Sequence, residues 1–341
     1  MKSNWYCVGK SSNDNGTGVL YRYDADSKKE QIAEISDFGY YFTDPLYYDP
    51  TEDALWFASY NNDILSLSKN KSPSSISSVN NINAVSGIDF SGKIGLAFAV
   101  QGSSLYLVYT DLSNFYFQYG KISGDGPFVF EPIGSPKTVS DLDLGVSGAI
   151  TDVAILYDGT VYVLVSNVGN SSGDSGDSFI YNYNQSNTMY SRGALLKIQS
   201  TSSGFEVVDT LGWTGSSRQI KPVGDAIYGG ESLKPLTAYI PSLSENSKKF
   251  YGPRRFVAIK PKAIAIADCG ANFVMPNHDE QQKGKMFAHN RVVTVSLSNF
   301  AISNVTELKN IKFSDLTISG TGTSGGYIDC AGCTKEDIKE Q

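Results

Sequence analysis

The chain has 341 residues, of which 40% are hydrophobic and 18% are charged, so it can bury a large core and is not a disordered chain. Its formal net charge of −7 excludes general nucleic-acid binding, because phosphate neutralisation needs a surplus of lysine and arginine. No run approaches the roughly 18 apolar residues that a membrane helix requires, so we expect no transmembrane segment. The 33 glycines and 21 tyrosines favour short strands joined by tight turns.

The amino-terminal segment predicts strands at residues 5–8 and 19–23 and contains no leader. Lys2 is followed by no apolar stretch, so the start is not a signal peptide. The abrupt start indicates that a leader was removed and an initiator Met supplied. We therefore expect an exported protein, whether periplasmic, cell-surface or secreted, although a cytoplasmic location stays open.

The next segment shows the organisation of the chain most clearly. Residues 46–50, 54–59 and 64–68 are apolar or alternating runs, and short polar clusters separate them. Because turn residues and strand residues follow each other so closely, this segment predicts an antiparallel meander.

Two longer segments repeat this pattern with four strands each. Residues 151–209 and 255–305 both predict strand, turn, strand, insertion, strand, short turn and strand, and Asp158-Gly159 is a favoured hairpin turn. A weaker copy spans residues 87–130. Four-stranded repeats of this length predict an all-β fold, a β-propeller of about six four-stranded blades, with five or seven left open.

The two ends of the chain are expected to close the ring. The amino-terminal strands lack a first strand, and residues 311–318 could supply it, which would leave no open sheet edge. Residues 212–252 are either a degenerate blade or long loops. We expect one propeller domain over residues 1–333 and a charged tail over residues 334–341.

The units at 151–209 and 255–305 resemble the blades of bacterial NHL- or YVTN-type propeller proteins, whose second strand often ends in a small-polar pair such as Ala267-Asp268. Residues 252–261 are similar to segments of secreted propeller lipoproteins of spirochaete type. The insertion between Asp268 and Asn290 departs from the compact family blade. The resemblance implies a scaffold that binds something, without naming a ligand.

Loop insertions carry the predicted binding residues. Between residues 248 and 291 there are nine basic and three acidic residues, and Arg254 and Arg255 are placed to grip a carboxylate or sulfate. Tyr181 and Tyr183 stand beside amide side chains, a combination suited to stacking on sugars and bonding their hydroxyls. The sequence thus predicts a non-enzymatic binding propeller that presents its insertions to a protein or glycan partner.

Neither a metal site nor a cofactor site is predicted. Cys330 and Cys333 form a CxxC, which is read as ordinary thiols, a local disulfide or a redox pair, since no second ligand pair completes a zinc site. The histidines His278 and His289 lie in a polar insertion that is more typical of plain surface.

Two further hypotheses remain. A glycan-active hydrolase or lyase would need carboxylates that converge in the central channel, and the nearest candidates are Asp44, Asp89 and Asp152. Alternatively, the chain is a purely structural domain of a larger surface protein.

Overall fold

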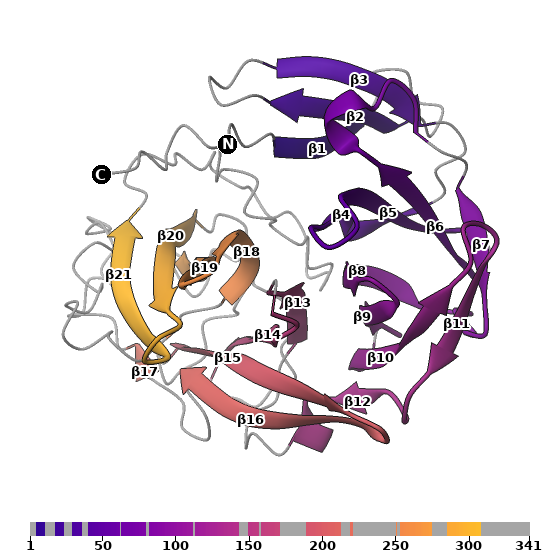
Figure 1. Cartoon of the computed structure of the whole chain (residues 1–341). Helices are drawn as coiled ribbons and strands as arrows, with labels where there is room; N and C mark the ends of the chain where they lie inside the picture. The colour runs from indigo at the N-terminus through magenta and orange to yellow at the C-terminus, as the bar shows by residue number, and fades with distance from the viewer. Residues whose placement is uncertain are drawn as a thin grey trace. The chain divides into compact units, whose positions relative to one another are not determined.

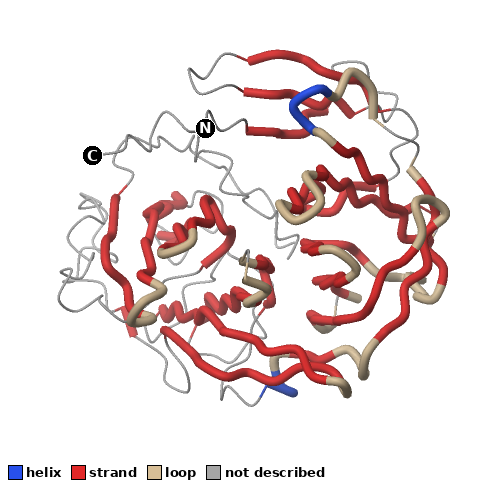
Figure 2. Tube along the Cα trace, in the orientation of Figure 1, coloured by secondary structure: helices blue, strands red, loops and turns tan. Residues whose placement is uncertain are grey.

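The part of the chain described by the computed structural model consists of β-sheets whose strands pair antiparallel, except for one parallel pairing (Figures 1 and 2). In that part no helix is longer than one turn; the two short 3-10 helices are η1 (Pro73–Ser75) and η2 (Ser140–Leu142). None of the described helices is long and apolar enough to cross a membrane. The described residues are 5–10, 18–23, 29–35, 40–61, 63–79, 82–111, 113–142, 149–156, 158–170, 189–212, 219–220, 250, 253–274 and 285–307.

The chain divides into two compact units, each of which is described by itself. Unit 1 comprises Met1–Leu142, Ile150–Val163 and Lys197–Val208. Unit 2 comprises Asp143–Ala149, Leu164–Leu196 and Asp209–Gln341. The predicted tail at residues 334–341 lies outside the described residues, and the single domain over residues 1–333 stays a prediction.

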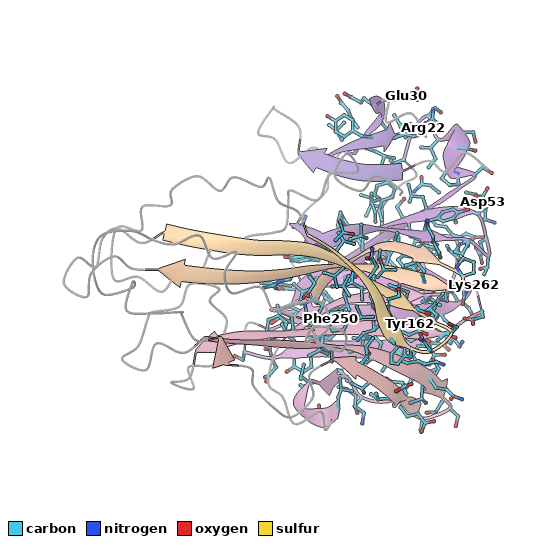
Figure 3. All side chains as sticks on the ribbon, turned by 90° about the vertical axis from the view of Figure 1, so that its left-hand side faces the viewer. Arg22, Glu30, Asp53, Tyr162, Phe250 and Lys262 are labelled. Carbon is cyan, nitrogen blue, oxygen red and sulfur yellow. The ribbon has the colours of Figure 1, made fainter. Side chains whose placement is uncertain are left out.

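The amino-terminal half contains one three-stranded sheet and two joined meanders. The first sheet has the order β1-β2-β3, and Arg22 on β2 pairs with Glu30 on β3 (Figure 3). The meanders β4 to β7 and β8 to β11 join through a parallel pairing of β7 with β11, and β12 pairs with β10. The bounds are β1 Trp5–Lys10, β2 Gly18–Tyr23, β3 Lys29–Ile35, β4 Tyr40–Asp49, β5 Ala54–Asn61, β6 Ile64–Lys71, β7 Asn83–Ser86, β8 Ile94–Gln101, β9 Ser104–Thr110, β10 Phe115–Ser123, β11 Phe128–Pro132 and β12 Lys137–Thr138.

Two further four-stranded meanders follow, with the strand orders β13-β14-β15-β16 and β18-β19-β20-β21. They confirm the strands predicted at residues 151–209 and 255–305. Repeated four-stranded antiparallel meanders are blades, and the chain is an all-β protein with the propeller architecture. The bounds are β13 Ala149–Ile155, β14 Val161–Asn170, β15 Met189–Thr201, β16 Gly204–Gly212, β17 Gln219–Ile220, β18 Pro253–Lys260, β19 Ala263–Val274, β20 Lys285–Ser296 and β21 Ala301–Glu307.

The number of blades and the closure of the ring stay predictions. The described sheet β1-β2-β3 has three strands, whereas the described meanders after it have four. The strand expected to complete it, residues 311–318, lies outside the described residues.

The second strand of three blades carries a buried aromatic side chain at an equivalent position. Trp56 and Tyr106 each stand two residues after the first hairpin pair, which is Asp49↔Ala54 in one blade and Gln101↔Ser104 in the next. Tyr162 occupies the same place after the Leu156–Thr160 turn, and all three side chains are buried. The repeat therefore extends from strand order to side-chain packing.

The core of unit 1 is aromatic between the two joined meanders. Phe42 on β4 stacks on Phe90 at 6.0 Å between ring centroids and meets Phe98 edge-on at 5.9 Å. Gly95 makes this approach feasible, because a Cβ atom there would lie 2.1 Å from a ring carbon of Phe42. Close packing of these rings joins the two meanders over a continuous apolar interface.

Candidate binding site

In unit 2, strands β19 and β20 extend past the sheet to which they belong. They pair continuously from Ala263↔Ser296 to Val274↔Lys285. Within the described residues, the pairing of β18 with β19 reaches Asp268, and that of β21 with β20 reaches Arg291. In the part of the chain that the structure describes, residues 269–274 and 285–290 therefore form a two-stranded ribbon beyond the four-stranded sheet, and Figure 3 shows its two long orange strands.

The register assigns the residues of this ribbon to two faces of different chemistry. Cross-strand partners share a face, and alternate residues along a strand share it too. One face is almost wholly apolar, and its register positions are Cys269, Ala271, Phe273, Met286, Ala288 and Asn290. The opposite face holds basic and polar residues among apolar ones, and its positions are Gly270, Asn272, Val274, Lys285, Phe287 and His289.

A row of charged residues lies at the base of the ribbon. Asp268 is fully buried and is the cross-strand partner of Arg291, which is itself paired with Glu307. A carboxylate is buried at tolerable cost only when a positive charge or donors compensate it. In the register, Arg291 and Glu307 are the positions that follow Asp268 across β20 and β21.

The predicted ligand-binding residues Arg254 and Arg255 lie beside this row. They are half-buried residues of β18, where the register shifts between Pro253, the partner of Asp268, and Arg255, the partner of Ala267. Arg254 is the extra residue of this bulge, and bulges re-aim side chains. The structure therefore places both arginines on a strand next to a buried carboxylate and not on a loop insertion.

In unit 1, the turns that follow the innermost strands are tied to one another by buried polar groups. Asp49, at the end of β4, accepts hydrogen bonds from the backbone N–H of Thr51 at 2.8 Å and of Gly102 at 2.8 Å. Gln101, at the equivalent end of β8, donates to the carbonyl of Leu156 at 3.0 Å. Each of these side chains thus bonds to the corresponding turn of the next blade. The two bonds hold neighbouring blades together.

A tyrosine completes this connection. The hydroxyl of Tyr47 donates to the carbonyl of Ile155 at 3.2 Å and accepts from its N–H at 2.9 Å. It thereby satisfies both backbone groups of one residue on β13. This side chain is committed to holding β4 and β13 together.

A second polar group lies at the start of β10. Asp111 accepts bonds from the N–H of Asn114 at 2.7 Å and from the hydroxyl of Tyr116 at 2.8 Å. The bond from Asn114 is the main cause of the lowered pKa of Asp111, and the bond to Asp111 is the main cause of the raised pKa of Tyr116. Asp111 therefore stays an anion and a hydrogen-bond acceptor, which makes it a turn-stabilising group.

The three carboxylates proposed for hydrolysis lie in unlike settings. Asp89 is exposed, and its pKa is lowered mainly by the N–H of Ser91, which donates to it at 3.0 Å. Asp152 is buried on β13 and accepts from the N–H of Val153 at 2.8 Å. Asp44 lies on β4, and its side chain is outside the described part. The residues that the structure describes include no group of three or more metal-ligating side chains.

The remaining predicted residues fall outside the described part of the chain. These are Tyr181, Tyr183, Cys330 and Cys333, and the predictions for them stand as made. The sequence predicts an insertion after Asp268, whereas the structure pairs residues 269–274 with residues 285–290. The alternation in Ala271-Asn272-Phe273 and the short apolar run Met286-Phe287-Ala288 were the signals that could have revealed paired strands.

Comparison with known proteins adds a family match over part of the chain. Residues 237–318 match the family model described as the TdpA C-terminal domain, and this segment contains β18 to β21 and the ribbon. No curated protein matches the chain.

Several solved structures share a general likeness at low identity. The Pseudomonas aeruginosa periplasmic gluconolactonase PpgL is 11% identical, with 91% of this chain and 85% of that chain covered and a TM-score of 0.36. The Bacteroides ovatus xyloglucan PUL GH43B is 12% identical, with 89% and 70% covered and a TM-score of 0.38. The N-terminal domain of Nup159 is 10% identical, with 89% and 75% covered and a TM-score of 0.32. At these scores the likeness supports no inference about activity.

Proposed function

We propose that the chain is a non-enzymatic binding propeller, and that the β19–β20 ribbon of unit 2 contacts a protein partner. The observation that supports this is the register, which carries the two strands beyond their sheet with an apolar row at Cys269, Phe273 and Met286. Among the described residues no further strand pairs with the ribbon, and a two-stranded ribbon by itself is marginally stable in water. A partner that covers the apolar face would remove this area from water and stabilise the ribbon.

Charge around the ribbon favours an acidic partner. Nine basic and three acidic residues stand between positions 248 and 291, although the chain as a whole carries −7. Arg255 on β18 is the basic residue that we assign to the contact, because its partner Ala267 has the same register parity as the apolar row, and Arg254 is the neighbour that supports it. Such local charge speeds association with an oppositely charged surface and discriminates against other partners.

The proposal also covers the compartment, an alternative ligand and an alternative function. The partner meets the protein outside the cytoplasm, in line with the resemblance to NHL- and YVTN-type propellers and secreted propeller lipoproteins. A glycan is the alternative ligand, with Tyr181 and Tyr183 as stacking residues and the arginines as anchors for acidic groups. A hydrolase or lyase with Asp152 in a catalytic role is the alternative function.

The experiment compares the intact protein with two matched variants in quantitative capture from extracts of the source cells. Phe273→Asp places a charge in the apolar row of the ribbon, whereas Val129→Asp places one at an exposed position on β11 that has no part in the proposal. We expect a partner that is retained by the wild type and by Val129→Asp and is lost with Phe273→Asp. Equal capture by all three proteins would contradict the role of the ribbon.

The alternatives are tested on the same preparation. A sulfated oligosaccharide at about 100 times its dissociation constant adds about 2.7 kcal/mol to the free energy of unfolding and raises the melting temperature. Such a rise that disappears with Arg254→Ala and Arg255→Ala would favour the glycan. Turnover of a glycoside or lactone that is abolished by Asp152→Asn would replace the binding proposal with an enzymatic one.

A further inference from the structure

The sequence contains several Asn-X-Ser/Thr triplets, the acceptor motif for N-linked glycans. Their asparagines are Asn15, Asn70, Asn170, Asn184 and Asn304. The structure describes the side chains of two of them, Asn70 and Asn304. These two differ in exposure, and this makes them a matched pair within one protein.

Asn304 is exposed on β21, the last strand of its sheet. Its cross-strand partner is Thr294, and the register shifts immediately beside this pair, where the hydroxyl of the exposed Ser303 donates to the carbonyl of Thr294 at 3.1 Å. A bulge changes the direction of the side chains beside it, and here Ser303 and Asn304 are both exposed. The amide nitrogen Nδ2 of Asn304 lies 3.4 Å from Oγ1 of Thr306, so the two functional groups of the motif are already neighbours on the surface.

Asn70 carries the same motif, Asn70-Lys71-Ser72, in the opposite environment. Its side chain is 2% exposed, and its Nδ2 donates to the Ser68 hydroxyl at 3.1 Å and to the Leu55 carbonyl at 3.4 Å. A sugar on this nitrogen would break both bonds and push apart β5 and β6, which are paired here. A folded protein therefore has no room for a glycan at Asn70.

We propose that Asn304 is an N-linked glycosylation site of the folded protein and that Asn70 is not. In the transfer, Nδ2 of Asn304 forms a bond to C1 of the sugar, the bond between C1 and the phosphate of a lipid-linked oligosaccharide donor breaks, and the amide proton passes to a base of the transferase. The proposal applies to an exported protein. It goes beyond partner binding by the ribbon and does not depend on it.

The position suggests a physical role for the sugar. Among the described strands β21 pairs only with β20, so in the described part of the chain it is the edge strand of its sheet. Such an edge is a template for pairing with another chain. A hydrated oligosaccharide at Asn304 would cover this edge and suppress that pairing.

The test expresses the full chain behind a signal peptide in a eukaryotic secretory host and analyses the folded, monodisperse secreted fraction. Enzymatic deglycosylation in ¹⁸O water, followed by peptide mass spectrometry, marks each modified asparagine. We expect modification at Asn304 and none at Asn70. Asn304→Gln and Thr306→Val should each lose the glycan at position 304, and Thr306→Ser should keep it.

Folded variants and the two asparagines distinguish the possible results. Thr306 is exposed and on the surface of an outer strand, so these variants should fold like the wild type, which circular dichroism checks. A folded wild-type fraction without sugar at Asn304 overturns the proposal, as does a glycan at Asn70 in the same fraction. Faster aggregation of Asn304→Gln than of the glycosylated wild type supports the role in covering the edge.

Discussion

Single polar residues in unit 1 act by satisfying backbone groups of distant segments. Asp49 and Gln101 stand at equivalent ends of innermost strands and bond to Gly102 and Leu156, which follow 53 and 55 residues later. A buried N–H without an acceptor costs more than its hydrogen bond gains. These side chains are therefore best understood as links between blades.

The first prediction concerns the carboxylate of Asp49, which is fully buried. Asp49→Ala removes the acceptor of the Gly102 N–H and should lower the free energy of unfolding by about 1–3 kcal/mol. Asp125→Ala, at an exposed turn, is the control and should change it by less than about 0.5 kcal/mol. Urea denaturation measures both. Equal stability of the two variants would mean that water replaces the lost acceptor.

The second prediction concerns stability at alkaline pH. Burial raises the pKa of Tyr106 to about 12, above the ordinary value near 10, and the Tyr106 hydroxyl is hydrogen-bonded to that of Ser200. The folded state therefore holds this proton more tightly than the unfolded state. Its contribution, on the order of 2–3 kcal/mol, is present below pH 10 and is lost as the pH rises to 12.

The variant Tyr106→Phe checks this directly. It should cost about 0.5–1.5 kcal/mol at pH 7 through the lost hydrogen bond, yet lose less stability than the wild type between pH 10 and 12. Urea melts at several alkaline pH values provide the comparison. Parallel curves for the two proteins would exclude Tyr106 as the titrating group. Burial also raises the pKa of Tyr109, so part of the alkaline loss should remain in the variant.

At the scale of elements, register and close approach decide which strands can neighbour each other. Within the described residues, β19 and β20 stay in register beyond Asp268, whereas the pairing of β18 and β21 extends no further than Asp268 and Arg291. The contact between β4 and β8 depends on a missing side chain, since Gly95 lies against the ring of Phe42. Both features are properties of strand pairs and packed sheets.

The third prediction follows from that contact. Gly95→Ala puts a methyl group 2.1 Å from a Phe42 ring carbon inside a close-packed aromatic core. It should lower the free energy of unfolding by about 1–3 kcal/mol or more, because overpacking forces strain. Gly159→Ala is the comparison, since its left-handed backbone costs about 1 kcal/mol but a Cβ there meets only the Gln101 amide oxygen at 3.6 Å. Thermal melts should rank Gly95→Ala below Gly159→Ala, and the reverse order would contradict the packing argument.

At the scale of the whole molecule, burial falls from the second strands to the outer strands of the blades. β9 is buried at every residue from 105 to 110, whereas β16 has buried residues only near its ends, at Gly204 and Leu211. Burial of both faces of a strand keeps water away from its backbone hydrogen bonds. Local opening therefore starts in the strands that are least buried.

The fourth prediction uses this gradient. Amides of β9 should exchange with deuterium at least about ten times more slowly than those of β16, because opening β9 exposes a doubly buried core. Hydrogen exchange with peptide-level mass spectrometry measures both strands in one experiment. Similar protection of the two would indicate that the blades open only as a whole.

The propeller architecture was predictable because its signals are local. Residues 54–59, 105–109 and 161–166 are apolar runs bounded by turn residues, and each became a second strand. The candidate site was predictable only in part. The sequence indicates Arg254 and Arg255 as basic residues. Their place on a bulged strand beside Asp268 depends on how β18 pairs with β19, and the sequence of neither strand alone predicts that pairing.

The sequence by itself determined the strands, the turns and the repeat, because alternation of side chains and turn chemistry act over a few residues. Tertiary structure alone decided how far β19 and β20 remain paired, why Asp49 is buried, and why Asn304 is exposed while Asn70 is enclosed. Burial is set by contacts between segments far apart in the chain, as in the bond from Gly102 to Asp49. The same three-residue motif can therefore lie in the core at one place and on the surface at another.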